Sequence, residues 1–146
     1  MNYTTYDPAT GELQGQFSTL SDDILSLSLK DKPYIEGKID PRKFYLDLTT
    51  LQPVAKPRDP SGPYSKYDFD WTTKTWVLNP DQTAKLVRQS RNEFLELIDR
   101  VNAVWYASLT TQQQTEIQQF RQALLDITQQ SGFPESVVWP PKPAWL

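Results

Sequence analysis

The spacing of apolar residues changes at Asn79-Pro80, and this change limits the chain to a fold made of two unlike parts. Before this point, short apolar runs alternate with clusters of Asp, Thr, Pro and Gly, which is typical of strands joined by turns. After it, no Gly or Pro occurs up to about residue 108, and apolar residues recur at helical spacing. The sequence therefore predicts an α+β chain in which a β-rich part precedes a helical part.

The first 79 residues predict a small antiparallel β-module. Residues 7–12 are rich in turn formers and can close a hairpin between the first two strands. Residues 72–74 join two alternating apolar runs in the same way. Residues 22–30 fit either an extended segment or one short helical turn. The predicted strands cover residues 3–6, 13–17, 34–39, 44–48, 51–57, 67–71 and 75–78, with the prolines of 51–57 indicating an edge.

A first long helix is predicted from residue 80 to about residue 108. Asn79 can cap it, Pro80 suits the first helical position, and Asp81 suits the positive end of the helix dipole. The apolar residues of this helix fall on a heptad repeat that is interrupted at Ser90. The repeat consists of Val87, Phe94 and Val101 at one heptad position, with Leu97 and Val104 at the second, d-type position.

A second helix is predicted for residues 110–131, and Gly132 is suited to end it. One face of this helix is apolar and consists of Ile117, Phe120, Leu124 and Ile127. Because a short connection joins the two helices, residues 80–131 predict a long two-helix hairpin or a coiled coil. The domain boundaries expected from the sequence are 1–79, 80–131 and 132–146.

The last segment, residues 132–146, predicts an extended Trp/Pro-rich tail. It holds two tryptophans and four prolines, and proline removes a backbone donor and disfavours helix in the residue before it. Such a tail either lies over its own domain or docks on another chain. Burying one Leu or Phe side chain stabilises a fold by roughly 1.5–3 kcal/mol, so two helices alone make a thin core. We therefore expect the tail or a partner to cover the helix pair.

Composition argues against several classes of protein. The net charge is −3 and the 15 Lys and Arg residues are scattered, so no basic stripe for nucleic acid is present. No apolar run approaches the roughly 20 residues of a membrane span, and the N-terminus lacks the pattern of a signal peptide. The chain has no His and no Cys, which removes the usual general base and the commonest metal ligands. We expect no catalytic, cofactor or metal site.

Three tryptophans of the chain allow two interpretations. Trp71, Trp76 and Trp105 could act as stacking platforms for a sugar, or they could belong to the apolar core. The core is the commoner place for such residues. If Trp71 and Trp76 face the same side of their hairpin, they form a cross-strand pair that stabilises it without any ligand.

The order of the motifs resembles the tailed-bacteriophage tail assembly chaperones, also called tail fibre assembly proteins. In the β-rich half the resemblance is carried by Tyr6-Asp7-Pro8-Ala9-Thr10-Gly11-Glu12, Ile35-Glu36-Gly37, Phe44-Tyr45-Leu46-Asp47, Val54-Ala55-Lys56-Pro57 and Phe69-Asp70-Trp71. In the helical half it is carried by Arg88-x-x-Arg91-Asn92-x-Phe94-Leu95-x-x-x-Asp99, Phe120-Arg121-Gln122-Ala123-Leu124 and Gly132-Phe133-Pro134-x-x-Val137-Val138-Trp139-Pro140. The resemblance covers nearly the whole chain through the order of these motifs.

The chain departs from the family pattern after Asp99. The family commonly has a Trp and then a break with a Pro before the second helix, whereas residues 100–105 here continue the helical pattern. The sequence therefore predicts a longer first helix than in relatives, and it favours a coiled-coil or oligomeric role.

The resemblance implies a protein without chemistry that binds and shields a phage tail fibre, or another tail or baseplate protein, in the host cytoplasm during assembly. Two alternatives are a structural component retained in the virion tail and a carbohydrate-binding adhesin module. A homo-oligomer is also compatible with the heptad repeat. The residues expected to contact the partner are Phe94, Leu97, Val101, Val104, Phe133, Val138, Trp139 and Trp145.

Overall fold

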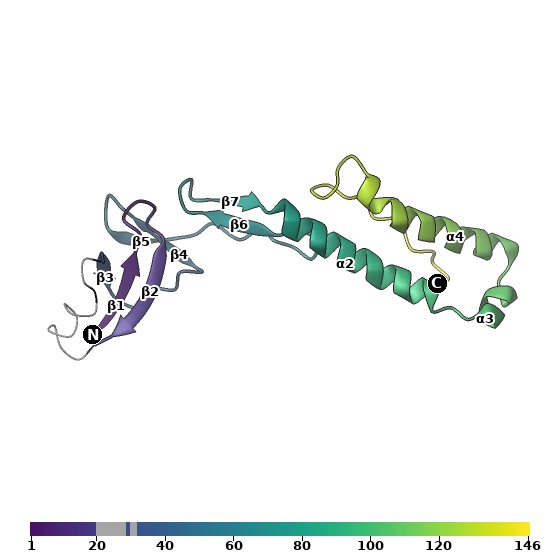
Figure 1. The fold of residues 1–146 in the computed structure, drawn as a ribbon, viewed down its shortest axis with the longest axis horizontal. Helices are drawn as coiled ribbons and strands as arrows, with labels where there is room; N and C mark the ends of the chain where they lie inside the picture. Colours follow the sequence, from purple (N-terminus) through teal and green to yellow (C-terminus); the bar gives the residue numbers. More distant parts are fainter. Residues whose placement is uncertain (20–28, 30–31) are drawn as a thin grey trace. The chain divides into compact units, whose positions relative to one another are not determined.

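The computed structural model describes residues 1–19, 29 and 32–146, which form two compact units (Figure 1). The β unit consists of Met1–Asp59 and Phe69–Val77, and the helical unit consists of Pro60–Asp68 and Leu78–Leu146. The prediction for residues 22–30 lies outside the described residues, except for Leu29. The three-part division of the chain at residues 79 and 131 stays a prediction.

Short antiparallel strands build the N-terminal part, as predicted. They are β1 (Asn2–Tyr6), β2 (Leu13–Ser18), β3 (Tyr34–Glu36), β4 (Phe44–Asp47), β5 (Gln52–Ala55), β6 (Tyr67–Asp70) and β7 (Thr75–Leu78). The first three form one sheet in the order β2-β1-β3, while β4 pairs with β5 and β6 with β7. Tyr3 of β1 lies opposite Phe17 of β2, and the register shifts between Thr4 and Tyr6.

One turn geometry occurs three times in the β unit. In each turn the backbone N–H of the fifth residue donates to the carbonyl of an aspartate, and the fifth residue has a positive φ. The pairs are Asp7–Gly11, Asp47–Leu51 and Asp70–Lys74, at 2.7, 2.8 and 2.8 Å, with φ values of 69°, 54° and 59°. Backbone N–H groups also donate to these aspartate side chains and lower the pKa of Asp47 and of Asp70. This internal repeat was not predicted, because Gly, Leu and Lys occupy its left-handed position.

Gly11→Ala is expected to destabilise the β unit by more than 1 kcal/mol, on the order of the known cost of backbone strain. A Cβ at Gly11 would lie 2.2 Å from the Leu46 carbonyl oxygen, where the Leu46 N–H donates to the Gly11 oxygen. Leu51→Ala is the matched control, since Leu51 already holds a side chain at the equivalent left-handed position. Urea unfolding followed by tryptophan fluorescence measures both variants. Equal losses for the two would contradict the proposed collision.

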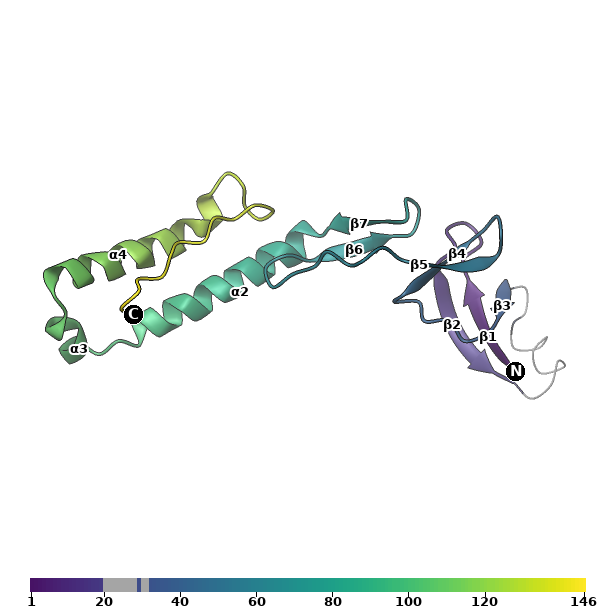
Figure 2. The same ribbon diagram turned by 180° about the vertical axis from the view of Figure 1, so that it is seen from behind.

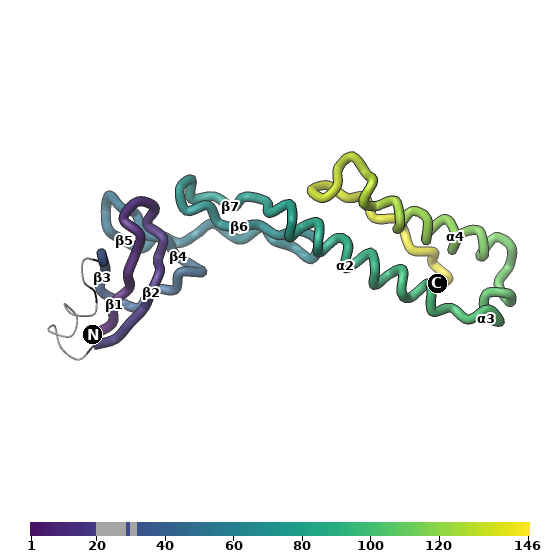
Figure 3. Tube along the Cα trace, in the orientation of Figure 1, coloured from purple at the N-terminus to yellow at the C-terminus, as the bar shows by residue number. Residues whose placement is uncertain are grey.

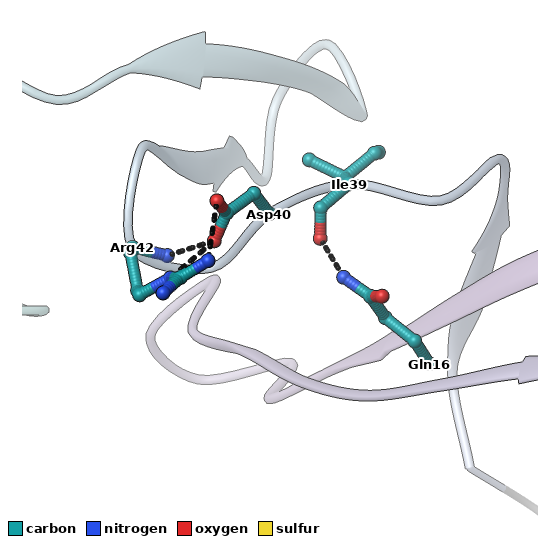
Figure 4. A network of polar contacts seen from close by, with 4 residues as sticks. All are labelled: Gln16, Ile39, Asp40 and Arg42. Carbon is teal, nitrogen blue, oxygen red and sulfur yellow. Dashed lines mark hydrogen bonds and ion pairs between the residues drawn. The ribbon is translucent and has the colours of Figure 1, made fainter.

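The β unit has a small apolar core with polar links around it. Tyr3, Leu13, Leu29 and Leu46 are buried, and Phe17 packs against Tyr3 and Leu29. Figure 4 shows two of the links: the Gln16 side chain donates to the Ile39 carbonyl, and the Arg42 guanidinium pairs with the Asp40 carboxylate. The first link attaches the segment between β3 and β4 to the first hairpin, and the second lies within that segment.

An aromatic cluster fills one side of the β6–β7 hairpin. Phe69 makes edge contacts with Trp71 and Trp76, with ring centroids 5.1 and 5.2 Å apart. The Lys56 ammonium lies 3.8 Å from the Trp71 ring centroid and 4.3 Å from that of Phe69, and burial lowers the pKa of Lys56. The Trp76 indole N–H donates to the Pro57 carbonyl at 2.9 Å. Both tryptophans are therefore engaged within their own unit.

The helical unit contains α2 (Pro80–Asp99), α3 (Ala103–Ser108), α4 (Thr111–Asp126) and the 3₁₀ turn η1 (Ile127–Gln129). Asn79 caps α2 as predicted, accepting from the Gln82 N–H at 2.9 Å, with Pro80 in the first turn. Thr110 and Gln113 form a capping box at the start of α4. In Figures 1 and 2, α2 and α4 run in opposite directions, and the tail lies between them.

The predicted long two-helix hairpin or coiled coil is wrong. The first helix ends at Asp99, and α3 begins at Ala103 as a separate helix. Its cap is Asn102, whose side chain accepts from the Trp105 N–H at 2.8 Å. This cap starts a separate helix without the proline-containing break that is common in the family. The heptad repeat fails as well, because Leu97 and Val104 are 66% and 81% exposed. The longer first helix inferred from residues 100–105 is therefore also wrong.

The core of the helical unit follows an ordinary 3.6-residue period. On α2 it includes the buried Val87 and Ile98 with the half-buried Phe94 between them. From α4 and η1 the core includes the buried Ile117, Phe120, Leu124 and Ile127, so the predicted apolar face of the second helix is confirmed. Several aromatic residues of the tail pack against this core, which gives the helix pair a third layer.

Candidate partner-binding surface

The tail lies against its own helices and is fastened there by a glutamine. Gln130 donates from its side-chain N–H to the Val138 carbonyl and accepts from the Val138 N–H, both at 2.8 Å. This amide thus pairs with the tail backbone as a neighbouring strand would. Figure 3 traces the tail from this point along α4. Of the two fates predicted for the tail, contact with its own domain is the one observed.

Aromatic side chains fix the rest of the tail. The Trp139 ring lies 4.8 Å from that of Tyr64 and 6.0 Å from that of Phe94, measured between centroids. The Trp145 indole N–H donates to the Glu116 carboxylate at 2.5 Å, and this bond lowers the pKa of Glu116. The tail therefore contacts both long helices at separate points along its length.

The structure divides the eight residues expected to contact a partner into two groups. Phe94, Val101, Phe133, Trp139 and Trp145 are half-buried, and all of these except Val101 pack against the core of the helical unit. Leu97, Val104 and Val138 are exposed, Val138 to 74%. We call Leu97, Val104 and the partly exposed Trp105 the junction residues, because they lie where α2 ends and α3 begins. They leave large apolar side chains uncovered in the described part of the chain.

Two cavities lie beside the end of α2. The first, about 330 Å³, is lined by Phe94, Leu97, Ile98, Phe120, Lys142 and Leu146, and we call it the anchor cavity. The second, about 340 Å³, is lined by Ile98, Val101 and Ile117 with a polar rim of Asp99, Gln118 and Arg121. The arrangement offers hollows for apolar side chains next to polar groups, which suits the binding of a protein segment.

An ion pair at this rim joins α2 to α4. The Arg121 guanidinium donates to both oxygens of the Asp99 carboxylate, at 2.8 and 3.3 Å. The bond from Arg121 holds the pKa of Asp99 below its ordinary value. Both side chains are about half exposed, so solvent screens the pair and its contribution to stability is modest.

Acid is expected to weaken the contact between α2 and α4 through Asp99. Because the folded-state pKa of Asp99 is lowered, the pair stabilises the fold above the ordinary carboxyl pKa of about 3.9 and is lost as the pH falls through the lowered value. Asp99→Asn removes this contribution at neutral pH, so its urea midpoint changes less between about pH 7 and 2.5 than that of the wild type. Arg121→Gln should behave alike, and unchanged pH dependence in both variants would contradict the pair's role.

Sequence reasoning missed several residues that organise this surface. Gln130 stands in a run of polar residues and shows no local sign of its role, and Asp99 and Arg121 are 22 positions apart. Ile98 could have been found, because Val87, Phe94 and Ile98 follow the 3.6-residue period that the heptad interpretation replaced.

In the part of the chain that the structure describes, no three acidic, His or Cys side chains are grouped to hold a metal ion. No helix among the described residues has the length and apolar character needed to span a membrane.

Residues 84–144, within the helical unit, match the model of one protein family. No curated protein and no solved structure shows significant similarity to the chain. The match runs from the second turn of α2, through α3 and α4, to the tail, and so includes the junction residues and the anchor cavity. Over these residues it confirms the resemblance stated from the sequence, and it supports a role in phage tail assembly. That family is described as phage tail assembly chaperone protein.

Proposed function

We propose that this chain binds a phage tail fibre or another tail or baseplate protein in the host cytoplasm and shields its apolar surface during assembly, without chemistry. Assembling fibres expose unpaired strands and apolar patches, which are templates for aggregation until they are covered. An apolar surface that binds reversibly can cover them without a nucleotide.

The observation that carries this proposal is the exposure of the junction residues within the segment that matches the family. Leu97 and Val104 are among the most exposed large apolar residues described, and their exposure has no structural benefit for the isolated chain. Val138 adds a further exposed apolar side chain on the tail. We propose Leu97, Val104 and Val138 as direct contacts and the half-buried Phe94, Val101, Phe133, Trp139 and Trp145 as residues that complete the interface around them.

The adhesin alternative finds little support in the geometry. A sugar platform needs an open aromatic face, but Trp71 and Trp76 pack against Phe69, and the Lys56 ammonium lies over Trp71. Trp105 is the most open of the three predicted platforms, at 38% exposure. Because the Trp105 ring centroid also lies 6.4 Å from that of Trp145, we assign it to the junction surface.

The test is co-expression of the full chain with each tail, baseplate and fibre protein of the same phage. We expect one of them to co-purify with the wild-type chain and the double variant Leu97→Asp, Val104→Asp to bind it at least about tenfold more weakly, which corresponds to roughly 1.4 kcal/mol. Both positions are exposed, so the helices should persist, as far-UV circular dichroism can check.

Leu51→Asp is the matched control, since it places a charge on an exposed leucine of the β unit. This variant should bind as the wild type does. The proposal fails if no tail protein co-purifies with the wild-type chain, or if the double variant and the control bind it equally well.

A further inference from the structure

The anchor cavity is built by three segments that are far apart in the sequence. Phe94, Leu97 and Ile98 come from α2, Phe120 from α4, and Leu146 from the tail. Ile98 and Phe120 are buried and form an apolar base, whereas Leu97 is 66% exposed and lies at the border with solvent. The tail thus closes one side of a hollow that it does not fill.

Space also remains on a second side of the tail. A cavity of about 370 Å³ lies between α4 and the proline stretch of the tail, and Glu116, Phe120 and Lys142 take part in its lining. Phe120 and Lys142 therefore border open space in both cavities. The tail occupies the groove between the helices with room left for side chains of another chain.

The positive charge of Lys142 beside the anchor cavity has no acidic partner in the part of the chain that the structure describes. Lys142 is exposed and makes no ion pair among the described residues. Glu116, which lines the cavity on the other side of the tail, already accepts from the indole N–H of Trp145 and from the Gln112 side chain, the latter at 2.9 Å. Every other side chain that lines the anchor cavity is apolar, so the single charged side chain of the lining is the unpaired cation of Lys142.

From this geometry we infer that the anchor cavity takes an apolar side chain of the partner that is followed closely by a carboxylate, which pairs with Lys142. This inference rests on the proposed function and names the chemistry of the segment that is recognised. The apolar side chain contacts Phe94, Ile98 and Phe120, and the carboxylate stays at the solvent border, where a charged hydrogen bond needs only partial desolvation. The expected motif is therefore Leu, Ile or Phe next to Asp or Glu.

The experiment uses the full chain and an array of overlapping 15-residue peptides covering the tail, baseplate and fibre proteins of the same phage. The peptides that bind most strongly should contain the apolar–acidic pair. For the best of them, replacing the acid by its amide or by Lys should weaken binding about tenfold, and replacing the apolar residue by Ala should do the same, as isothermal titration calorimetry measures.

Charge reversal makes the test specific. Lys142→Glu should lose the wild-type peptide and recover binding of the peptide whose acid is replaced by Lys, while Lys85→Glu, with the same change in net charge on an exposed position of α2, should change neither. The inference is overturned if Lys142→Glu binds both peptides as the wild type does, or if the bound peptides lack the pair.

The inference and the proposed function fail in different ways. Co-purification of a tail protein that depends on the junction residues, together with peptides insensitive to Lys142, would leave the function standing and remove this motif. Absence of any bound tail protein and any bound peptide would remove both.

Discussion

Leu124→Ala is expected to lower the free energy of unfolding of the helical unit by about 2–5 kcal/mol. Leu124 is 1% exposed and lies in the core shared by α2, α4 and the tail. Truncating it removes buried apolar surface and leaves a cavity that close-packed neighbours fill only in part. Urea unfolding followed by far-UV circular dichroism reports on this unit, because it contains the long helices.

Leu97→Ala is the matched control for this loss. The same side chain is removed from a long helix of the same unit, but Leu97 is 66% exposed. Its substitution should change the unfolding free energy by less than about 0.5 kcal/mol. A loss at Leu97 comparable to that at Leu124 would contradict the placement of the core and restore a role for the heptad repeat within the chain.

Trp139→Ala is expected to destabilise the helical unit by about 3 kcal/mol. The indole packs against Tyr64 and Phe94, so its removal opens the contact that holds the middle of the tail. Once that contact is lost, the tail should become accessible to proteases. Limited proteolysis with identification of the fragments by mass spectrometry, beside urea unfolding, measures both effects.

Val138→Ala serves as the comparison for Trp139. Val138 is the neighbouring residue and is 74% exposed, and its backbone bonds to Gln130 do not depend on its side chain. This variant should keep both the stability and the protease resistance of the wild type. Rapid cleavage of the tail in the wild-type chain, at the rate seen for Trp139→Ala, would contradict a tail seated on its helices.

Local patterns predicted the strands and the second helix well. Clusters of Asp, Thr, Pro and Gly separate the strands, and the buried face of α4 follows one clear helical period. The start of α2 could be predicted equally well, because Asn79 is a good helix cap and Pro80 is suited to the first helical turn.

The prediction for the end of α2 was wrong for a physical reason. Residues 100–102 contain no Gly or Pro, so the sequence shows no strong helix breaker after Asp99, where α2 ends. Asn102 caps a separate helix instead, and an Asn cap is a weaker sequence signal than a proline. The regular seven-residue spacing of Val87, Phe94 and Val101 then suggested a seam, although Ile98 is the buried residue at that end.

The packing of the tail against its own helices could not be derived from the sequence. An extended segment with tryptophans and prolines has the same local preferences whether it lies on its own helices or on another chain. The position of the tail is determined by hydrogen bonds between residues that are apart in the sequence, such as Gln130 with Val138 and Glu116 with Trp145. No rule of sequence spacing links the members of these pairs. The anchor cavity depends on the same packing and was equally out of reach.

The most direct test of the proposed role compares the tail fibre protein of the same phage produced with and without this chain. We expect the fibre protein to be soluble and correctly assembled in its presence, by sedimentation and size-exclusion chromatography with light scattering, and to aggregate in its absence or when the double variant Leu97→Asp, Val104→Asp replaces the wild type. Every other tail or baseplate protein that co-purifies with the chain is tested in the same way. Soluble, correctly assembled proteins in the absence of the chain would contradict a role in shielding them.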